Sequence, residues 1–80
     1  MKTVEIYSTA TCHFCQMAKE FFKTNNIQYT DYNVGLDTEK RQEMLEISGQ
    51  LGVPVMVIDK KDAVIGFDEK KLRELLELPA

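Results

Sequence analysis

The sequence predicts an α/β fold in which a four-stranded mixed sheet carries helices on both faces, and three observations support this class. Short segments rich in β-branched residues alternate with segments whose apolar residues recur at helical spacing. Glycine, asparagine or proline stands near the ends of most of these segments. The chain has 80 residues, which is the size of one small domain, so we expect a single domain over residues 1–80.

The first part of the chain is expected to form a strand, a helix and a second strand. Residues 2–8, KTVEIYS, are few and rich in β-branched side chains. From Phe14 onward the apolar residues follow the i, i+3, i+4, i+7, i+8 pattern of a helix with one buried face, which ends at residues 24–26. Residues 27–34 alternate in character and predict the second strand. Two strands joined by a helix in this way are parallel neighbours with a right-handed crossover.

The middle of the chain is expected to form a second helix and a third strand. Residues 38–48 follow Asp37, whose side chain suits a helix N-cap, and precede Gly49, a natural helix stop. Residues 53–59, VPVMVID, form a continuous apolar run, which is typical of a strand covered on both faces.

The end of the chain is expected to form a hairpin partner and a last helix. Residues 63–66 should pair with the preceding strand, and Asp68 should cap the final helix. The resulting order, β-α-β-α-β-β-α, is that of the thioredoxin-like fold. The residues expected in its core are Met17, Phe21, Phe22, Met44, Leu45, Ile47, Val55, Val57, Leu72 and Leu75.

Composition and charge argue against two classes of function. The net charge is -3, and lysine and arginine occur in short pairs rather than in a basic run, so we expect no nucleic-acid surface. No apolar stretch approaches the ~20 residues that span a bilayer, and the N-terminus lacks the apolar core of a signal peptide. We therefore expect a cytoplasmic protein without membrane attachment, in a compartment where a permanent disulfide is unusual.

The stretch TCHFCQ, residues 11–16, holds both cysteines of the chain, Cys12 and Cys15. Cys12 falls where the first strand ends and the first helix begins, so we expect its sulfur near unpaired backbone N–H groups that stabilise a thiolate. Cys15 lies one helical turn further on and should be more buried. This asymmetry suits two-step exchange, in which Cys12 attacks a substrate disulfide and Cys15 resolves the mixed disulfide.

Other interpretations of the cysteine pair stay open. A closed zinc site needs four ligands, and only His13 stands beside the two cysteines as a further strong candidate. A metal shared between two chains, as zinc or an iron–sulfur group, or a copper-carrying domain, is a second alternative. An inert structural staple is disfavoured, because two cysteines are too few for a disulfide scaffold. We predict no bound metal and no bound cofactor, with Cys12–Cys15 as a redox-active disulfide.

Three segments together resemble the glutaredoxin family: VEIYSTATCHFCQMAKEFF, GVPVMVID and AVIGFDEKKLRELL. The resemblance covers essentially the whole chain and is closest to the glutaredoxin-like redoxins, which include the hydrogen donors of ribonucleotide reductase. It implies a thiol–disulfide oxidoreductase with a cis Val53–Pro54 bond facing Cys12. A cis bond there would leave the Val53 backbone free to pair with an extended substrate. The alternative is a trans proline that simply starts the third strand.

The chain departs from glutathione-using glutaredoxins at three places. Those proteins usually carry a lysine just before the C-x-x-C motif, whereas residues 8–11 are STAT here. They usually have threonine before Val-Pro, where this chain has Gly52, and a second glycine where Phe67 follows Gly66. A phenyl ring there would crowd glutathione, so the resemblance implies reduction by a flavoprotein of the thioredoxin reductase type. Glutathione dependence stays as the disfavoured alternative.

The surface around the cysteines is expected to bind a disulfide-containing protein, with this chain as a monomer. Phe14 is either core or an exposed contact beside Cys12, and the resemblance favours the contact. His13 either helps to hold the Cys12 thiolate or is simply exposed. Tyr7 either flanks the binding groove or lies in the sheet with its hydroxyl at the rim. The expected contact residues are Tyr7, Thr11, His13, Phe14, Val53, Pro54, Gly66, Phe67 and Asp68.

Overall fold

The computed structural model describes residues 2–79, so the expected domain of residues 1–80 extends one residue beyond the described part at each end. Strands and helices follow one another in the predicted order β-α-β-α-β-β-α. They are β1 Val4–Ser8, α1 His13–Thr24, β2 Thr30–Asn33, α2 Thr38–Ser48, β3 Val55–Ile58, β4 Asp62–Ile65 and α3 Glu69–Leu75. Within residues 2–79, no helix combines the length and the apolar character that crossing a bilayer requires.

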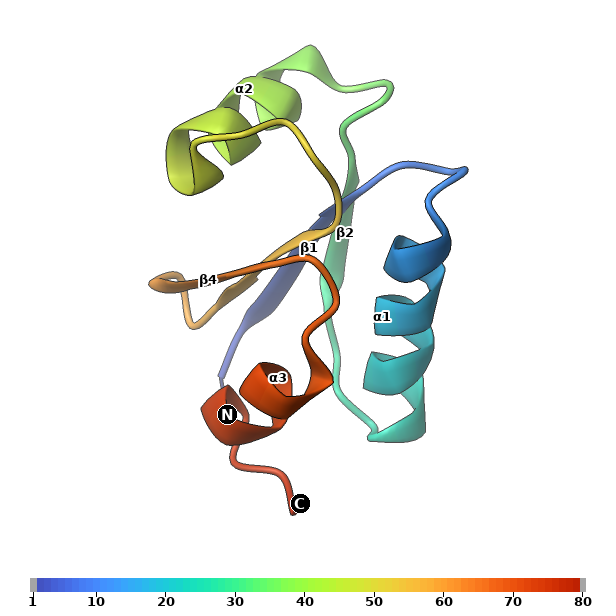
Figure 1. Ribbon diagram of the computed structural model, residues 1–80, viewed down its shortest axis with the longest axis vertical. Helices are drawn as coiled ribbons and strands as arrows, with labels where there is room; N and C mark the ends of the chain where they lie inside the picture. Colours follow the sequence, from blue (N-terminus) through green and yellow to red (C-terminus); the bar gives the residue numbers. More distant parts are fainter. Residues whose placement is uncertain (1, 80) are drawn as a thin grey trace.

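The strands form one mixed sheet in the order β2-β1-β3-β4, which confirms the predicted architecture. β1 and β2 are parallel, with Tyr7 opposite Tyr32. β3 is antiparallel to β1 and β4, and its first residue, Val55, lies opposite Tyr7 on the other side. Figure 1 shows α2 on one face of the sheet and α1 with α3 on the other. The C-terminal ends of β1 and β2 and the start of β3 therefore meet at one end of the sheet, where α1 begins. This end is called here the sheet edge.

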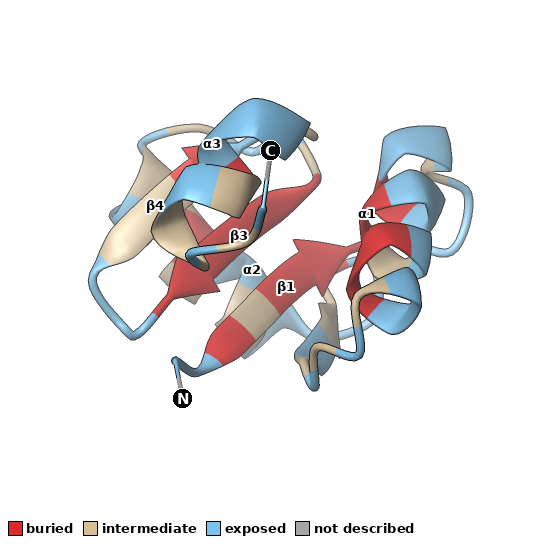
Figure 2. Ribbon diagram, turned by 90° about the horizontal axis from the view of Figure 1, so that it is seen from below, coloured by how far each residue is buried: buried red, intermediate tan, exposed pale blue. Residues whose placement is uncertain are grey.

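Each face of the sheet carries its own apolar cluster. The cluster under α1 and α3, called here the α1–α3 cluster, contains Val4, Ile6, Ala18, Phe21, Phe22, Met56, Ile58, Val64 and Leu72. The cluster under α2, called here the α2 cluster, contains Tyr7, Val34, Met44, Val55 and Val57. β3 supplies both clusters with alternate residues and is buried throughout, as Figure 2 shows. This position explains its continuous apolar sequence.

The predicted helix caps are confirmed. Asp37 accepts the backbone N–H of Lys40 at 3.1 Å, and Asp68 accepts that of Lys71 at 3.1 Å. Gly49 ends α2 with φ at 74°, a left-handed angle that glycine adopts without strain. These local signals are strong in the sequence because each cap satisfies backbone groups that the helix leaves unpaired.

Two residues expected in the core are exposed, and both predictions were wrong. Met17 is 38% exposed and Ile47 is 41% exposed. The stripe predicted for α1 took in Met17 together with Ala18, Phe21 and Phe22. In the structure the buried residues of α1 are Cys15, Ala18, Phe21 and Phe22. Cys15 and Met17 lie on opposite flanks of this stripe, and spacing alone does not decide which flank faces the sheet.

The first three strands are shorter than the sequence suggested, and β4 starts one residue earlier than predicted. β2 covers Thr30–Asn33 rather than residues 27–34. Ile27 and Tyr29 precede the paired segment, yet both pack against the α1–α3 cluster. Their apolar character is therefore explained by burial in this cluster and not by pairing within a strand. Leu45 and Leu75, both expected in the core, are half-buried.

Candidate redox site

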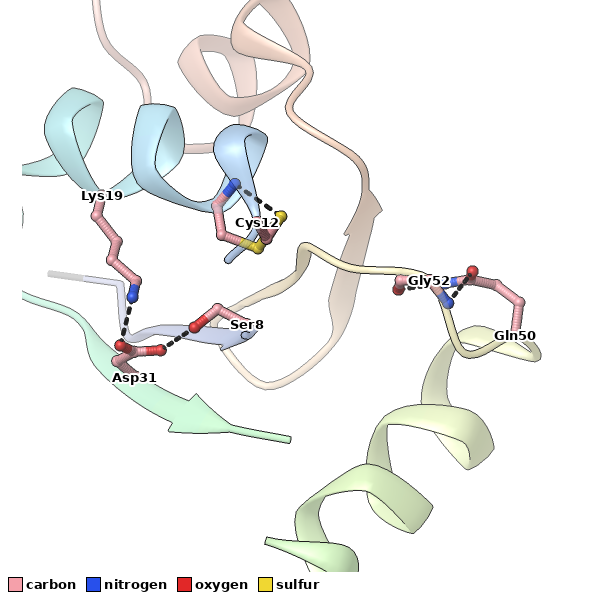
Figure 3. Close-up of a disulfide and its surroundings, with 7 residues drawn as sticks. Ser8, Cys12, Lys19, Asp31, Gln50 and Gly52 are labelled. Atoms are coloured by element: carbon pink, nitrogen blue, oxygen red, sulfur yellow. Dashed lines mark hydrogen bonds and ion pairs between the residues drawn. A yellow bond between two sulfur atoms is a disulfide. The ribbon is translucent and has the colours of Figure 1, made fainter. Parts of the chain in front are cut away.

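The two cysteines occupy the first turn of α1, at the edge of the sheet where β1 ends. Cys12 is the N-cap residue, with extended backbone angles, and Cys15 lies inside the helix. The Cys15 N–H donates a hydrogen bond to Cys12 Sγ at 3.1 Å (Figure 3). A sulfur in this position takes the place that a serine or aspartate oxygen has in other helix caps. The helix start therefore favours negative charge on Cys12 when the pair is reduced.

Cys12 and Cys15 are joined by a disulfide, with Cα atoms 5.2 Å apart. Cys12 is half-buried, whereas Cys15 is 0% exposed. The predicted difference in burial is thus confirmed. A partner thiol or disulfide approaching from solvent meets Cys12 first, while Cys15 is positioned to react only with Cys12.

The Val53–Pro54 peptide bond is cis, as the resemblance implied. Pro54 immediately precedes Val55, which pairs with Tyr7 near the end of β1, so this bond and the cysteines lie at the same edge of the sheet. Pro54 O accepts the N–H of Gly66 at 2.9 Å. The loop before α3 is therefore tied to the loop before β3.

Phe67 and Phe14 differ in their exposure and in their contacts with α1. Phe67 is half-buried, and its ring centroid is 5.9 Å from that of Phe21. The rings of Phe67 and Phe21, together with Met17, line a hollow between α1 and α3. Phe14 is 57% exposed, so the alternative of a core residue is excluded and the exposed position expected for a partner contact is confirmed.

The remaining expected contact residues are placed as follows. Thr11 and His13 are exposed, as is Asp68 at the start of α3. The His13 ring meets the Phe14 ring edge-on, with centroids 5.8 Å apart. Gly66 has φ at 79°, which a residue with a side chain rarely adopts. All four lie in the loops and helix starts at the sheet edge near the cysteines or the Val53–Pro54 bond.

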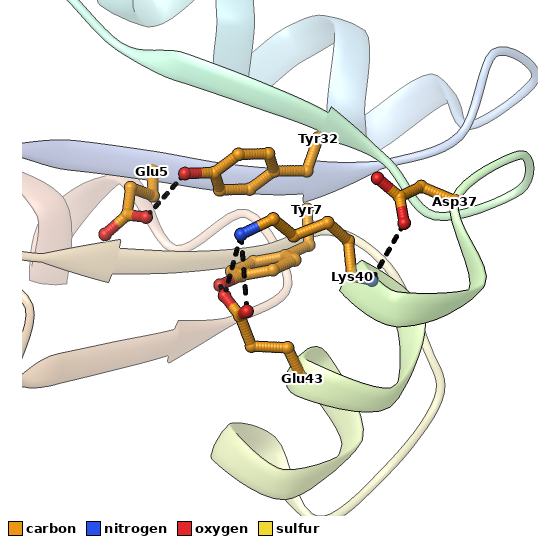
Figure 4. A network of polar contacts seen from close by, with 6 residues as sticks. All are labelled: Glu5, Tyr7, Tyr32, Asp37, Lys40 and Glu43. Carbon is orange, nitrogen blue, oxygen red and sulfur yellow. Dashed lines mark hydrogen bonds and ion pairs between the residues drawn. The ribbon is translucent and has the colours of Figure 1, made fainter.

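The expectation that Tyr7 flanks the binding groove needs correction. Its side chain is 1% exposed and belongs to the α2 cluster. The hydroxyl donates to Glu43 Oε1 at 2.5 Å (Figure 4). Burial, followed by the hydrogen bond to Glu43, raises the pKa of Tyr7 far above its ordinary value. Tyr7 is therefore a sheet residue that joins β1 to α2, which is the alternative left open by the sequence.

A polar network surrounds Tyr7 on this face. Tyr32 donates to Glu5 Oε2 at 2.8 Å, and this hydrogen bond raises the pKa of Tyr32. Lys40 Nζ lies 3.2 Å from Glu43 and 4.1 Å from the centroid of the Tyr32 ring. The hydrogen bond from Tyr7 is the main reason why the pKa of Glu43 is lowered, and Lys40 adds to the effect.

Sequence reasoning missed a second polar group near the disulfide. Ser8 is 1% exposed, and its hydroxyl donates to Asp31 Oδ1 at 2.6 Å. Lys19 Nζ lies 2.7 Å from Asp31 Oδ2, which links α1 to β2 (Figure 3). These residues are far apart in the sequence and carry no shared motif, so only the parallel pairing of β1 and β2 brings them together. Within residues 2–79, no three histidine, cysteine, aspartate or glutamate side chains are grouped as metal ligands.

The fold and this site define a class. A thioredoxin-like sheet, a cysteine pair at the N-terminus of its first helix and a cis proline at the same edge characterise the thiol–disulfide oxidoreductases. The profile of the glutaredoxin family matches residues 4–63. The chain therefore belongs to the glutaredoxin family, and it is a thiol–disulfide oxidoreductase.

Individual relatives and solved structures agree with this assignment. A glutaredoxin-like 8.6 kDa protein in the rubredoxin operon of Clostridium pasteurianum is 42% identical over 92% of this chain and 97% of its own length. Glutaredoxin 3 of Escherichia coli K12 is 34% identical over 74% of this chain and 71% of its own.

Among solved structures, a mutant of the thioredoxin-like protein BC3987 has a TM-score of 0.89, at 35% identity over 99% of this chain and 100% of its own. A glutaredoxin from Archaeoglobus fulgidus has a TM-score of 0.83, at 30% identity over 95% and 87% of the two chains. The likeness therefore extends over nearly the whole chain in both sequence and fold.

Proposed function

We propose that this protein is a dithiol carrier that reduces disulfide bonds in other proteins. The Cys12 thiolate attacks one sulfur of the substrate disulfide, and the other sulfur leaves as a thiolate. The Cys15 thiolate then attacks the Cys12 sulfur, which frees the second substrate thiolate and leaves the Cys12–Cys15 disulfide. Two electrons pass from the carrier to the substrate. The observation that carries this proposal is the burial of Cys15 beneath a half-exposed, helix-capping Cys12.

The proposed partner surface consists of the exposed residues around Cys12 and the hollow between α1 and α3. Phe14 offers an apolar contact beside the cysteines, and Phe67 with Met17 offers a second one at the hollow. Thr11, His13, Gly66 and Asp68 complete the set. Exposed apolar side chains at the reactive edge favour a protein over a small hydrophilic thiol as the partner. The cytoplasmic location and the monomeric state stay predictions.

For the return of electrons to the carrier, we propose a flavoprotein of the thioredoxin reductase type. The segment before Cys12 supplies no lysine, and Phe67 occupies a place where glutathione-using relatives keep a small residue. The half-buried ring of Phe67 is held against Phe21, so moving it aside for glutathione would cost an aromatic contact. Membership of the glutaredoxin family favours the second candidate, reduction by glutathione.

One experiment separates the two reductants. The oxidised protein is mixed either with NADPH and a thioredoxin-reductase-type flavoenzyme, or with NADPH, glutathione and glutathione reductase, and NADPH consumption is followed. We expect turnover with the flavoenzyme and little with glutathione, and none in either case for Cys12→Ser. Turnover only with glutathione would overturn the proposed reductant and keep the exchange chemistry. The carrier function would be contradicted by absence of turnover in both assays, if the purified protein also contained zinc or iron that protected Cys12 and Cys15 from alkylation.

A further inference from the structure

The loop between α2 and β3 contains a side-chain brace next to the Val53–Pro54 bond. The Gly52 N–H donates to Gln50 Oε1 at 2.6 Å, and Gln50 Nε2 donates to Gly52 O at 3.0 Å (Figure 3). One side-chain amide thus supplies both the acceptor and the donor that a neighbouring strand would supply. Gly52 directly precedes Val53, so the brace fixes the peptide unit that leads into the cis bond.

Gln50 is itself held by the end of α2. The Ser48 hydroxyl lies 2.9 Å from Gln50 O and 2.7 Å from Met44 O, and Gln50 Nε2 lies 3.4 Å from Ser48 Oγ. Met44 is 0% exposed. Consecutive polar contacts therefore connect a buried residue of α2 to Gly52, in addition to the packing of Val53 against the α2 cluster.

Gly52 is required by this contact and not by its backbone angles. A Cβ atom at Gly52 would lie 2.6 Å from Gln50 Oε1. At Gly49 and Gly66 the opposite holds, because φ is 74° and 79° and a Cβ atom would meet nothing within 4 Å. A side chain at position 52 would push the glutamine amide away. The brace therefore depends on glycine at position 52. Glutathione-using glutaredoxins usually carry threonine at this position.

The brace leaves the next residue available for a partner. Within residues 2–79, the backbone of Val53 takes part in no hydrogen bond, whereas Pro54 O is occupied by Gly66. We propose that Gln50 is a positioning residue, which presents the Val53 N–H and C=O to an extended polypeptide carrying the substrate disulfide. The proposal rests on the function proposed above. Among the described residues, the hydrogen bonds of Gln50 join it to Ser48 and Gly52 and none joins it to Cys12 or Cys15, so it acts on the binding of extended chains and not on thiol exchange.

The test compares two disulfides that differ in whether a backbone is present. One substrate is a pair of short extended peptides joined by a disulfide, and the other is the small aromatic disulfide dithionitrobenzoate. Gln50→Ala removes the brace directly, and Gly52→Ala removes it by displacing the amide. For the peptide disulfide, each variant should raise KM about five-fold with little change in kcat, which is the effect of one lost hydrogen-bonding arrangement. The rates at which both variants reduce the small disulfide should match the rate of the unmodified protein.

One further single variant and one double variant serve as controls. Gln42→Ala replaces an exposed glutamine of α2 outside the brace and should change neither substrate. Gln50→Ala combined with Gly52→Ala should equal either single variant, because both remove the same contact. An unchanged KM for the peptide, or equal losses with both disulfides, would overturn the inference. If the unmodified protein reduces neither disulfide in a Cys12-dependent way, the proposed function itself fails.

Discussion

The two faces of the sheet are held by different kinds of contact. Under α1 and α3 the contact is an apolar cluster to which α1 alone gives three fully or nearly fully buried residues, Ala18, Phe21 and Phe22. Within the described chain, α2 buries one residue, Met44. Polar contacts of Tyr7, Glu43 and Lys40 add to the small apolar cluster on this face (Figure 4).

This difference assigns separate properties to the two parts of the site. α1 carries the cysteines mainly on buried apolar surface, which depends less on pH and salt than contacts between charged groups do, although Lys19 of α1 also pairs with Asp31. α2 carries the loop with Gln50 on contacts between ionisable groups, which depend on both. The reactive pair should therefore stay in place under conditions that loosen the loop.

The strongest test of the α1–α3 face is Phe22→Ala. Phe22 is 0% exposed, so its removal leaves a cavity and should cost about 3–5 kcal/mol of unfolding free energy. Such a loss is a large part of the stability of a small domain. Urea unfolding followed by circular dichroism measures it. The matched control is Phe14→Ala, a 57% exposed phenylalanine of the same helix, which should cost no more than about 0.5 kcal/mol. Similar costs for the two would contradict the packing described.

The corresponding test of the α2 face is Met44→Ala. Met44 is also 0% exposed, but the cluster around it has fewer buried residues than the α1–α3 cluster. We expect the unfolding free energy to fall by about 2–3 kcal/mol, which is at the lower end for such substitutions. Ile47→Ala, at a 41% exposed position of α2, serves as the control and should change little. A cost for Met44→Ala equal to that of Phe22→Ala would mean that the faces do not differ.

The same contrast explains which features the sequence could predict. Caps such as Asp37 and the order of strands and helices depend on residues that are neighbours in the chain, so both were predictable. The asymmetry of Cys12 and Cys15 followed from their place at a helix start. Apolar packing on the α1 face was predictable except for Met17, because spacing alone does not decide whether the flank with Cys15 or the flank with Met17 faces the sheet.

The polar contacts were not predictable, because each joins residues whose proximity depends on the sheet. Tyr7 and Glu43 are 36 positions apart, and nothing in the local pattern shows that they meet. The brace between Gln50 and Gly52 is local, yet glutamine and glycine occur in many loops without such a contact. A glycine in a family position that usually holds a larger residue was the one signal that could have indicated it.

A third prediction concerns the pH dependence of the α2 face. Tyr7→Phe removes the hydroxyl that chiefly lowers the pKa of Glu43 and should cost about 1 kcal/mol near neutral pH. A carboxyl group with a lowered pKa in the folded state stabilises fully above its ordinary value of 4.5. That contribution disappears as the pH falls through the lower, folded-state value, because the unfolded chain binds the proton first. The difference between the unmodified protein and Tyr7→Phe should therefore shrink below pH 4.5.

Unfolding curves at several pH values measure this difference. Tyr29→Phe is the matched control, since Tyr29 packs against the α1–α3 cluster and its hydroxyl forms no hydrogen bond within the described chain. Its small effect should be constant with pH. A pH-independent loss for Tyr7→Phe would show that the hydroxyl contributes by packing alone.

The smallest expected effects come from two half-buried cations, one on each side of the sheet. Lys40 pairs with Glu43 at 3.2 Å on the α2 side, and Arg73 pairs with Glu69 at 2.9 Å on α3. Each cation also lies over an aromatic ring. Ion pairs at the surface contribute little, so Lys40→Met and Arg73→Met should each cost about half or less of the loss from Tyr7→Phe.

Salt separates these two pairs. The carboxylate of Glu43 also accepts the hydrogen bond from buried Tyr7, whereas Glu69 is exposed and pairs with Arg73 within α3. Loss of Lys40 should therefore weaken the link between α2 and the sheet, and the loss should diminish as added salt screens the pair. Loss of Arg73 should affect α3 and its contact with the Phe21 ring of α1, and not the α2 face. Unfolding curves at low and high salt, read together with the peptide KM, test this distinction. A rise in peptide KM for Lys40→Met but not for Arg73→Met would show that the polar face of α2 supports the loop that carries Gln50.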